Sequence, residues 1–484
     1  MLKKIFNSQT KPITKGALIL GTSYFISAIL GLFRDRLLVG HFGAGLELDV
    51  YFAAFRVPDF VYNILILGGL IVAFLPLFAE YFSRNKVDEA NASSPPFANA
   101  RVNEVWQMTN YVLNAFLIFL ISISFIFFLL TPWLIKWIFP GFGPEHYKLA
   151  IPLTRLLFLS PIFFGVSNLL SGILQYFQRF FIYSLTPILY NLGIIFGILF
   201  LAPHFGIFGV GMGVVFGAFL HMAIQIPTAR NCGFSYKFLL DFKYPAIKRI
   251  FKLMVPRVFG VAAQQINLIV ITAIASTITS GSIAIFSISN NFQSLPVGII
   301  GASFAVAIFP TLSRFFAENQ KKEFLENFSS IFRQILFFII PISILIFLLR
   351  NQIIGILYRT GKFGLEDAKL ASACLGIFAL SIFAQSLIPL LARAFFSLQD
   401  TKIPTLITIS AVFLNIILSF SFIWLLRASN IFSNFLIEFF SLLRNENISL
   451  LGLPLAFSIS AIFQFVLLTL FLRKKLRVDN YEKK

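Results

Sequence analysis

Residues 14–41 decide the fold of this chain, and they read TKGALILGTSYFISAILGLFRDRLLVGH. The part from Gly16 to Phe33 contains no charged residue and approaches the roughly 20 residues with which a helix crosses a bilayer. It is longer than the apolar part of a signal peptide, and no cleavage pattern of small residues follows it. We therefore expect residues 14–41 to remain in the protein as its first membrane span.

The same composition extends over the whole chain. Of its 484 residues, 58% are hydrophobic and 12% are charged, whereas soluble domains average about 25% charged residues. This composition excludes a soluble enzyme. We predict an all-α polytopic membrane protein with twelve transmembrane helices near residues 14–41, 51–83, 107–138, 149–178, 183–203, 206–230, 247–276, 283–316, 327–357, 367–398, 403–427 and 450–472.

The net charge of +19 comes from lysines and arginines that separate the apolar stretches. They form no basic face with interleaved aromatic residues, so anionic membrane lipids are a better partner than nucleic acid. If the N-terminus is inside, the cytoplasmic loops carry most of the 39 lysines and arginines, and only the segment 350–369 argues against this orientation. We expect both termini to be cytoplasmic.

Metal and disulfide chemistry find no support in the sequence. Cys232 and Cys374 lie far apart, and the four histidines form no pair with the spacing of zinc ligands. We predict no metal site, no catalytic residue and no cofactor.

Two weak internal repeats divide the chain. Residues 74–82, FLPLFAEYF, resemble residues 308–316, IFPTLSRFF, and Gln178 with Asn191 is echoed by Gln399 with Asn415. The simplest model has two six-helix lobes of the same topology, residues 1–232 and 233–484, related by an axis along the membrane normal. Transporters built in this way bind their substrates between the two lobes.

Apart from the arginines assigned to loops and span ends, six arginines lie inside the predicted spans. Each costs about 2.5 to 3.5 kcal/mol at the centre of a membrane helix, so it usually faces a cavity, pairs with an acid or reaches the interface. These arginines are Arg34, Arg36, Arg56, Arg155, Arg257 and Arg393.

The densest polar stretch carries a family resemblance. Residues 31–36, GLFRDR, are followed by HFGAG at 41–45, by Asp49 and by AFRVPD at 54–59. This pattern resembles the MurJ (MviN) family of lipid II flippases in the MOP exporter superfamily, whose first helix carries G-x-x-R-D before an F-G-A-G turn. The resemblance extends to LMVPR at 253–257, FPTLS at 309–313 and ARAFFSLQDTKIP at 392–404.

The resemblance implies a MOP-type fold in which two six-helix lobes surround a central cavity. It implies a flippase that moves lipid II, the undecaprenyl-pyrophosphate-linked peptidoglycan precursor, from the cytoplasmic to the outer leaflet by alternating access. The protein would lie in the bacterial cytoplasmic (inner) membrane, and we expect a monomer. Sodium is the coupling ion that the family suggests, with no site assigned here. The two further C-terminal helices of many relatives are expected to be missing.

By the same resemblance, Arg34, Asp35 and Arg56 belong to a cationic cavity that receives the pyrophosphate, with Asp35 orienting a guanidinium. The planar donor fork of arginine suits phosphate oxygens. The alternative is an ion pair that only packs helices. The cavity is expected to be less cationic than in better-known members, because Ala28, Tyr62 and Asn291 stand where those carry arginines and Leu67 where they carry an acid.

Three further residues complete the predicted substrate site. Asp49 occupies the place of a family aspartate thought to matter for transport, but an acid there is also a good helix cap. Arg257 would face Arg34 across the lobe interface or extend to the cytoplasmic surface. Arg393 would contact substrate or a lipid phosphate.

Other functions stay open at this point. A flippase for another polyprenyl-linked oligosaccharide, or a cation-coupled exporter of the same superfamily, would suit the same fold. A membrane glycosyltransferase would need a catalytic acid, and commonly a metal-binding acidic pair, in an outer loop; the loops offer Glu145, Glu366, Asp367 and Glu446, without a recognisable motif. A scaffold that has lost transport is the last alternative.

Overall fold

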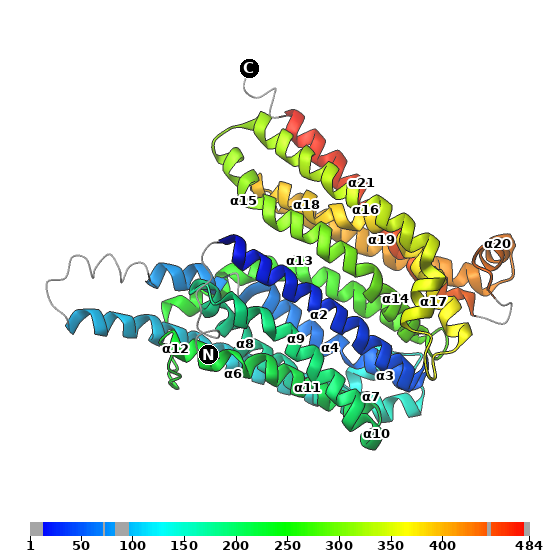
Figure 1. Ribbon diagram of the computed structural model, residues 1–484, viewed down its shortest axis with the longest axis horizontal. Coiled ribbons are helices and arrows are strands. Elements are labelled where there is room, and N and C mark those ends of the chain that lie inside the picture. Colours follow the sequence, from blue (N-terminus) through cyan, green and yellow to red (C-terminus); the bar gives the residue numbers. More distant parts are fainter. Residues whose placement is uncertain (1–12, 71–72, 83–95, 443–446, 479–484) are drawn as a thin grey trace. The chain divides into compact units, whose positions relative to one another are not determined.

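The computed structural model describes residues 13–70, 73–82, 96–442 and 447–478, and the elements assigned in this part of the chain are helices (Figure 1). The chain divides into two compact units. The first comprises residues 1–37, 53–137 and 143–265, and the second comprises residues 38–52, 138–142 and 266–484. The unit boundaries fall within four helices, so each of these helices contributes residues to both units.

The first unit contains the N-terminal part of α2 (Ile13–Phe42) and most of α13 (Pro245–Ser276). Between them it holds α4 (Arg56–Tyr62), η1 (Asn63–Leu70), α6 (Pro96–Ile138), α7 (Pro144–Leu157), α8 (Leu159–Tyr176), α9 (Phe180–Phe196), η2 (Gly197–Leu201), α10 (Ala202–Phe205), α11 (Ile207–Ala223) and α12 (Gln225–Asn231).

The second unit contains most of α3 (Leu46–Ala54) and the C-terminal part of α13. It also holds α14 (Ser282–Pro296), η3 (Val297–Ala302), α15 (Ser303–Ala317), α16 (Lys321–Leu357), α17 (Leu365–Ala379), α18 (Ile382–Ser397), α19 (Lys402–Arg427), α20 (Ile431–Phe440), η4 (Ile448–Leu451) and α21 (Gly452–Val478).

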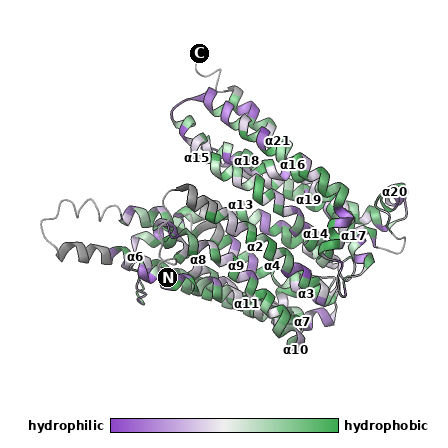
Figure 2. Cartoon of the chain, viewed as in Figure 1, coloured by the Kyte–Doolittle hydropathy of each residue, from purple (hydrophilic) through white to green (hydrophobic). Residues whose placement is uncertain are grey.

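Eight helices of the described part are long and apolar enough to cross a membrane, and the bent pair α17 and α18 makes a ninth candidate. Figure 2 shows apolar residues along most of the helix length. The protein is therefore an all-helical, multi-span membrane protein. The eight spans are Glu104–Ile138, Pro144–Tyr176, Phe180–Phe205, Ile207–Asn231, Ser282–Ala317, Lys321–Leu357, Lys402–Arg427 and Ile448–Leu476.

The predicted spans at 14–41, 51–83 and 247–276 do not appear among these eight. The side chains of residues 13–18 in α2, and of several residues between 255 and 260 in α13, lie outside the described part of the chain, so these two spans stay predictions. The span predicted at 51–83 is divided into α3, α4, η1 and the apolar helix 73–82. Its residues 71–72 and 83 lie outside the described part. Broken helices occur in membrane proteins where neighbouring segments satisfy the freed backbone groups.

Helices α9 and α11 of the first unit pack so closely that glycine is required at their contact. A Cβ atom added to Gly193 would lie 2.3 Å from the Cα of Gly217, and one added to Gly197 would lie 2.6 Å from the Cα of Gly213. Membrane helices often associate in this way, through small residues that let two backbones approach. The spacing of four residues between these glycines follows from the helical repeat.

The two glutamines of the second predicted repeat end helices in the same way. Gln178 follows α8 with a φ of 55°, and Gln399 follows α18 with a φ of 57°. In both places the next amide turns back onto the helix, from Arg179 to the Leu174 carbonyl at 2.8 Å and from Asp400 to the Phe395 carbonyl at 3.0 Å. A left-handed residue after the last turn is a common way to end a helix.

Candidate functional site

Arg34 and Asp35 form a hydrogen-bonded cluster with Asn191 inside the first unit. The Arg34 guanidinium donates from Nε and Nη2 to Oδ1 of Asp35, at 2.9 and 2.7 Å, and from Nη1 to Oδ1 of Asn191 at 3.0 Å. Asp35 is 4% exposed, whereas the Arg34 side chain is 21% exposed. The cluster therefore fixes the orientation of the guanidinium on a side chain that remains partly exposed.

Asn191 connects this cluster to another turn of α2. Its Nδ2 donates to the backbone carbonyl of Ser27 at 3.3 Å and to the Ser27 hydroxyl at 3.1 Å. One amide side chain of α9 thus accepts from Arg34 and donates to the residue seven positions earlier on α2. Because residues seven apart lie on the same face of a helix, Asn191 holds that face of α2 against α9.

The repeat partner of Asn191 makes a similar contact in the second unit. Asn415 on α19 donates from Nδ2 to Oδ1 of Asn267 on α13 at 3.0 Å. In each unit, an asparagine on a later helix therefore bonds to a polar side chain on the helix that opens that half of the chain. The internal repeat in the sequence drew attention to both asparagines, but it did not identify their hydrogen-bond partners.

Arg56 begins α4 and lies near an acid that the sequence did not single out as a site residue. Asp59, three residues further on, is close enough to interact electrostatically with Arg56, and both side chains are half-buried. Residues three apart on a helix are neighbours, so this pairing could have been found from the AFRVPD motif itself.

Asp49 holds the N-terminus of another helix. Its Oδ2 accepts from the backbone N–H of Gly281 at 2.6 Å, and its Oδ1 accepts from the backbone N–H of Ala284 at 2.8 Å. Asp49 is 2% exposed, and Gly281 directly precedes α14. The carboxylate satisfies amides that have no partner within the helix and lies at the positive end of the helix dipole. The acid therefore caps α14, in contrast to the expected cap on a helix of its own segment.

The remaining two predicted residues lie on α13 and α18. The Arg393 guanidinium lies 5.6 Å from the ring centre of Phe309, a cation–π contact between α18 and α15. Arg257 lies within α13, and its side chain is outside the described residues. Arg34, Asp35 and Arg56 thus belong to the first unit, and Asp49 and Arg393 belong to the second.

The side chains that the structure describes offer no metal site. Over the described ranges, no group of three or more histidine, cysteine, aspartate or glutamate side chains could hold an ion. The arginine cluster offers hydrogen-bond donors and positive charge, which suits an anionic group with several oxygen acceptors.

Sequence comparison relates the chain to one protein family. The family model described as lipid II flippase MurJ matches residues 38–483. A probable lipid II flippase MurJ from Rhizobium tropici is 30% identical over 418 residues, covering 84% of this chain and 74% of the relative. A protein of the same description from Buchnera aphidicola is 29% identical over 409 residues, covering 83% of this chain and 76% of the relative.

Structural comparison agrees with the sequence. The chain superposes on a lipid II flippase MurJ in an inward closed conformation with a TM-score of 0.74 and 25% identity, covering 94% of this chain and 87% of the other. An inward-facing multidrug resistance transporter of the MATE family shares the fold, with a TM-score of 0.72 and 14% identity over 93% of this chain and 95% of the other. Because the family model covers most of the chain and the fold agrees, this protein belongs to the MurJ family of lipid II flippases, which are membrane transporters and not enzymes.

Proposed function

We propose that this protein moves lipid II across the bacterial cytoplasmic membrane, from the inner to the outer leaflet. The observation that carries this proposal is the match of residues 38–483 to the lipid II flippase family. The arginine cluster on α2 supports it, because the substrate carries a pyrophosphate that needs charged donors. The substrate would be the undecaprenyl-pyrophosphate-linked peptidoglycan precursor.

Arg34 is the residue that we propose to contact the pyrophosphate. Asp35 accepts from Nε and Nη2 of its guanidinium and Asn191 accepts from Nη1, and 21% of the side chain remains exposed. A guanidinium that is already oriented loses less conformational freedom when it binds an anion. In this proposal Asp35 positions Arg34, and Arg56 adds a second positive charge whose field Asp59 reduces.

The other residues of the predicted site come from both units, because Arg257 belongs to the first unit and Asp49 and Arg393 belong to the second. We propose that Arg257 and Arg393 bind the substrate during part of the transport cycle. Asp49 would act differently, because both of its oxygens bond to the amides that begin α14. A role for Asp49 in transport would therefore come through the position of α14.

Transport would proceed by alternating access of two lobes of six helices, residues 1–232 and 233–484, with both termini in the cytoplasm. The glutamine and asparagine pairs, which recur in both halves with similar hydrogen bonds, support the two-lobe arrangement. A membrane potential that is negative inside favours outward movement of anions by about 2.3 kcal/mol per charge per 100 mV. A pyrophosphate with about two charges would gain roughly 4 to 5 kcal/mol, and the family resemblance suggests sodium for the return step.

Complementation tests this function. A bacterium depleted of its own flippase would receive wild-type protein or Arg34→Ala, Arg34→Lys or Lys136→Ala, and survival would be scored together with lipid II accumulation. We expect rescue by the wild type and by Lys136→Ala, loss of rescue by Arg34→Ala, and partial rescue by Arg34→Lys, which keeps the charge without the planar fork. A wild type that inserts in the membrane but does not rescue would refute lipid II as the substrate.

A further inference from the structure

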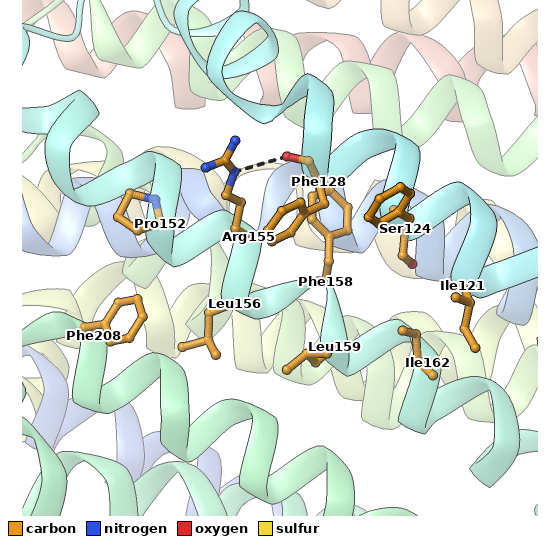
Figure 3. Close-up of a pocket in the computed structure, with 11 residues that line it drawn as sticks. Ile121, Ser124, Phe128, Pro152, Arg155, Leu156, Phe158, Leu159, Ile162 and Phe208 are labelled. Atoms are coloured by element: carbon orange, nitrogen blue, oxygen red, sulfur yellow. Dashed lines mark hydrogen bonds between the residues drawn. The ribbon is translucent and has the colours of Figure 1, made fainter.

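A pocket in the first unit lies apart from the arginine cluster. Its volume is about 450 Å³, within the range of about 300 to 1,000 Å³ that is typical of ligand pockets. It lies between α6, the bend from α7 to α8, and the start of α11, and Figure 3 shows side chains from all of these elements around it. Apolar side chains form nearly all of its lining, and Arg155 and Ser124 are the polar residues that the lining includes.

Arg155 is held at one end of this pocket. Its Nε donates to the backbone carbonyl of Phe128 at 3.1 Å, and its guanidinium lies 4.8 Å from the Phe128 ring centre. These contacts fix the plane of the guanidinium. Figure 3 shows the two terminal nitrogens pointing away from the apolar side chains, and they make no hydrogen bond with any residue that the structure describes. The two terminal nitrogens of the guanidinium can therefore donate to an anion with two oxygen acceptors.

Ser124 provides a second polar group without a partner. It is 3% exposed, and its Oγ makes no hydrogen bond within the described part of the chain. Ser124 lies four residues from Phe128, about 6 Å along α6 in the direction away from Arg155. A buried hydroxyl without a partner is unfavourable in an apolar environment, so rotation of the Ser124 side chain toward a ligand that offers an acceptor in the pocket would be favourable.

The position of the pocket relative to the membrane suits a bound lipid. Trp133 and Trp137, on the same helix, are 68% and 83% exposed, and exposed tryptophans mark the membrane–water interface. Phe128 lies five residues before Trp133, about 7.5 Å below that level, a depth from which an arginine side chain reaches the interface. From there the apolar lining continues to Ile121 on α6 and Ile162 on α8, toward the middle of the membrane.

We propose that this pocket binds one anionic phospholipid of the surrounding membrane. The phosphate would accept from the terminal nitrogens of Arg155, an ester carbonyl would accept from Ser124 once that side chain rotates into the pocket, and one acyl chain would fill the apolar part of the pocket toward Ile121 and Ile162. With the orientation proposed above, this lipid belongs to the outer leaflet. The site is independent of the arginine cluster that we assign to the transported substrate.

Native mass spectrometry of the purified full-length protein tests the proposal, with phosphatidylglycerol as the anionic probe and phosphatidylcholine as the neutral probe. We expect the wild type to retain phosphatidylglycerol in preference. Arg155→Gln should reduce the ratio of bound phosphatidylglycerol to phosphatidylcholine by roughly fivefold, the effect of one basic side chain at an anionic membrane surface. Lys136→Gln removes an exposed cation near the same end of α6, outside the pocket, and should leave the ratio unchanged.

A second pair of variants tests whether the lipid occupies the apolar part of the pocket. Ile162→Trp fills the pocket and should abolish retention of the tightly bound lipid, whereas Ile126→Trp adds the same side chain at a position that is 53% exposed and should not. Equal retention by these two folded variants would overturn the proposal. An unchanged lipid preference in Arg155→Gln would do the same, as would displacement of phosphatidylglycerol from the wild type by equimolar undecaprenyl phosphate.

Discussion

Arg34 illustrates how a single charged residue is accommodated in this protein. An isolated arginine in the membrane is costly, but here the neighbouring Asp35 neutralises the charge and Asn191 accepts a further hydrogen bond. The sequence predicted the Arg34–Asp35 pair from the R-D motif, since adjacent residues need no knowledge of the fold. It could not predict Asn191, whose distance from Arg34 in the sequence is 157 residues.

Asp35→Ala should destabilise the protein. The substitution removes two charge-assisted hydrogen bonds from the Arg34 guanidinium and leaves its charge partly buried. We expect the free energy of unfolding to fall by roughly 1 to 3 kcal/mol, measured as a lower melting temperature in detergent. The double variant Arg34→Met with Asp35→Leu should recover most of the loss, because it leaves neither partner buried alone. A double variant less stable than Asp35→Ala would contradict this explanation.

Asp400 gives the protein a stability that depends on pH. This residue lies between α18 and α19, where it bonds to Lys475 and accepts from the amides of Lys402 and Ile403. Partial burial opposes ionisation, but the hydrogen bond and charge of Lys475 and the two amides outweigh it, so the pKa of Asp400 is lowered. The charged form is therefore favoured more strongly in the folded state than in the unfolded state.

The sign of this dependence follows from linkage. A carboxyl whose pKa is lower when folded contributes stability above its unfolded pKa of about 3.9 and loses it as the pH falls through the folded pKa. Asp400→Asn should therefore melt at a lower temperature than the wild type at pH 7, and the difference should shrink below about pH 4. Melting curves of both proteins across pH would measure it, and a difference that grows in acid would show the opposite linkage.

At the scale of elements, close packing depends on where small residues lie on a helix. Glycine is common in membrane helices, so the glycines of α9 and α11 are not unusual in the sequence. Their spacing does not indicate which helix they face. The structure shows that they face each other, with backbones too close for any Cβ atom. Gly355 on α16 differs, because a Cβ atom there would have no other atom within 4 Å.

Gly197→Ala should separate α9 from α11, because its Cβ atom would lie 2.6 Å from the Cα of Gly213 and backbone atoms cannot move aside cheaply. We expect a loss of roughly 1 to 3 kcal/mol in the free energy of unfolding, as in other overpacked interiors. Gly355→Ala is the matched control and should be neutral or slightly stabilising, since alanine favours helix formation. Thermal unfolding of the two variants measures this difference. Equal melting temperatures would refute the requirement for glycine at residue 197.

The start of α14 depends on a carboxylate from α3. Asp49→Ala would leave the amides of Gly281 and Ala284 without that acceptor in a buried place. We expect a loss of about 0.5 to 2 kcal/mol, the usual effect of removing a helix cap. Hydrogen exchange of the first turn of α14 should become faster, while exchange in α9 of the other unit should not change. Unaltered exchange at residues 281–284 would show that the cap is dispensable.

For the whole molecule, the orientation in the membrane rests on the distribution of lysine and arginine. Both termini are expected to be cytoplasmic, since positive charges in short loops are retained on that side. Green fluorescent protein fused after Lys484 should therefore fluoresce, and alkaline phosphatase fused there should be inactive. Alkaline phosphatase fused to a chain truncated at Gly364, in the predicted outer loop, should be active. The reverse pattern would invert the proposed direction of transport.

Hydropathy, charge and local motifs were sufficient to predict a multi-span helical membrane protein of the MurJ family. These signals are local, because the length of an apolar run and the identity of neighbouring residues do not depend on the fold. Tertiary structure alone decided that Asp49 caps α14 and that Asn191 holds Arg34, since these contacts join residues 232 and 157 positions apart. Hydrogen bonds between helices form only between the faces that packing brings together, and a single sequence does not record which faces those are.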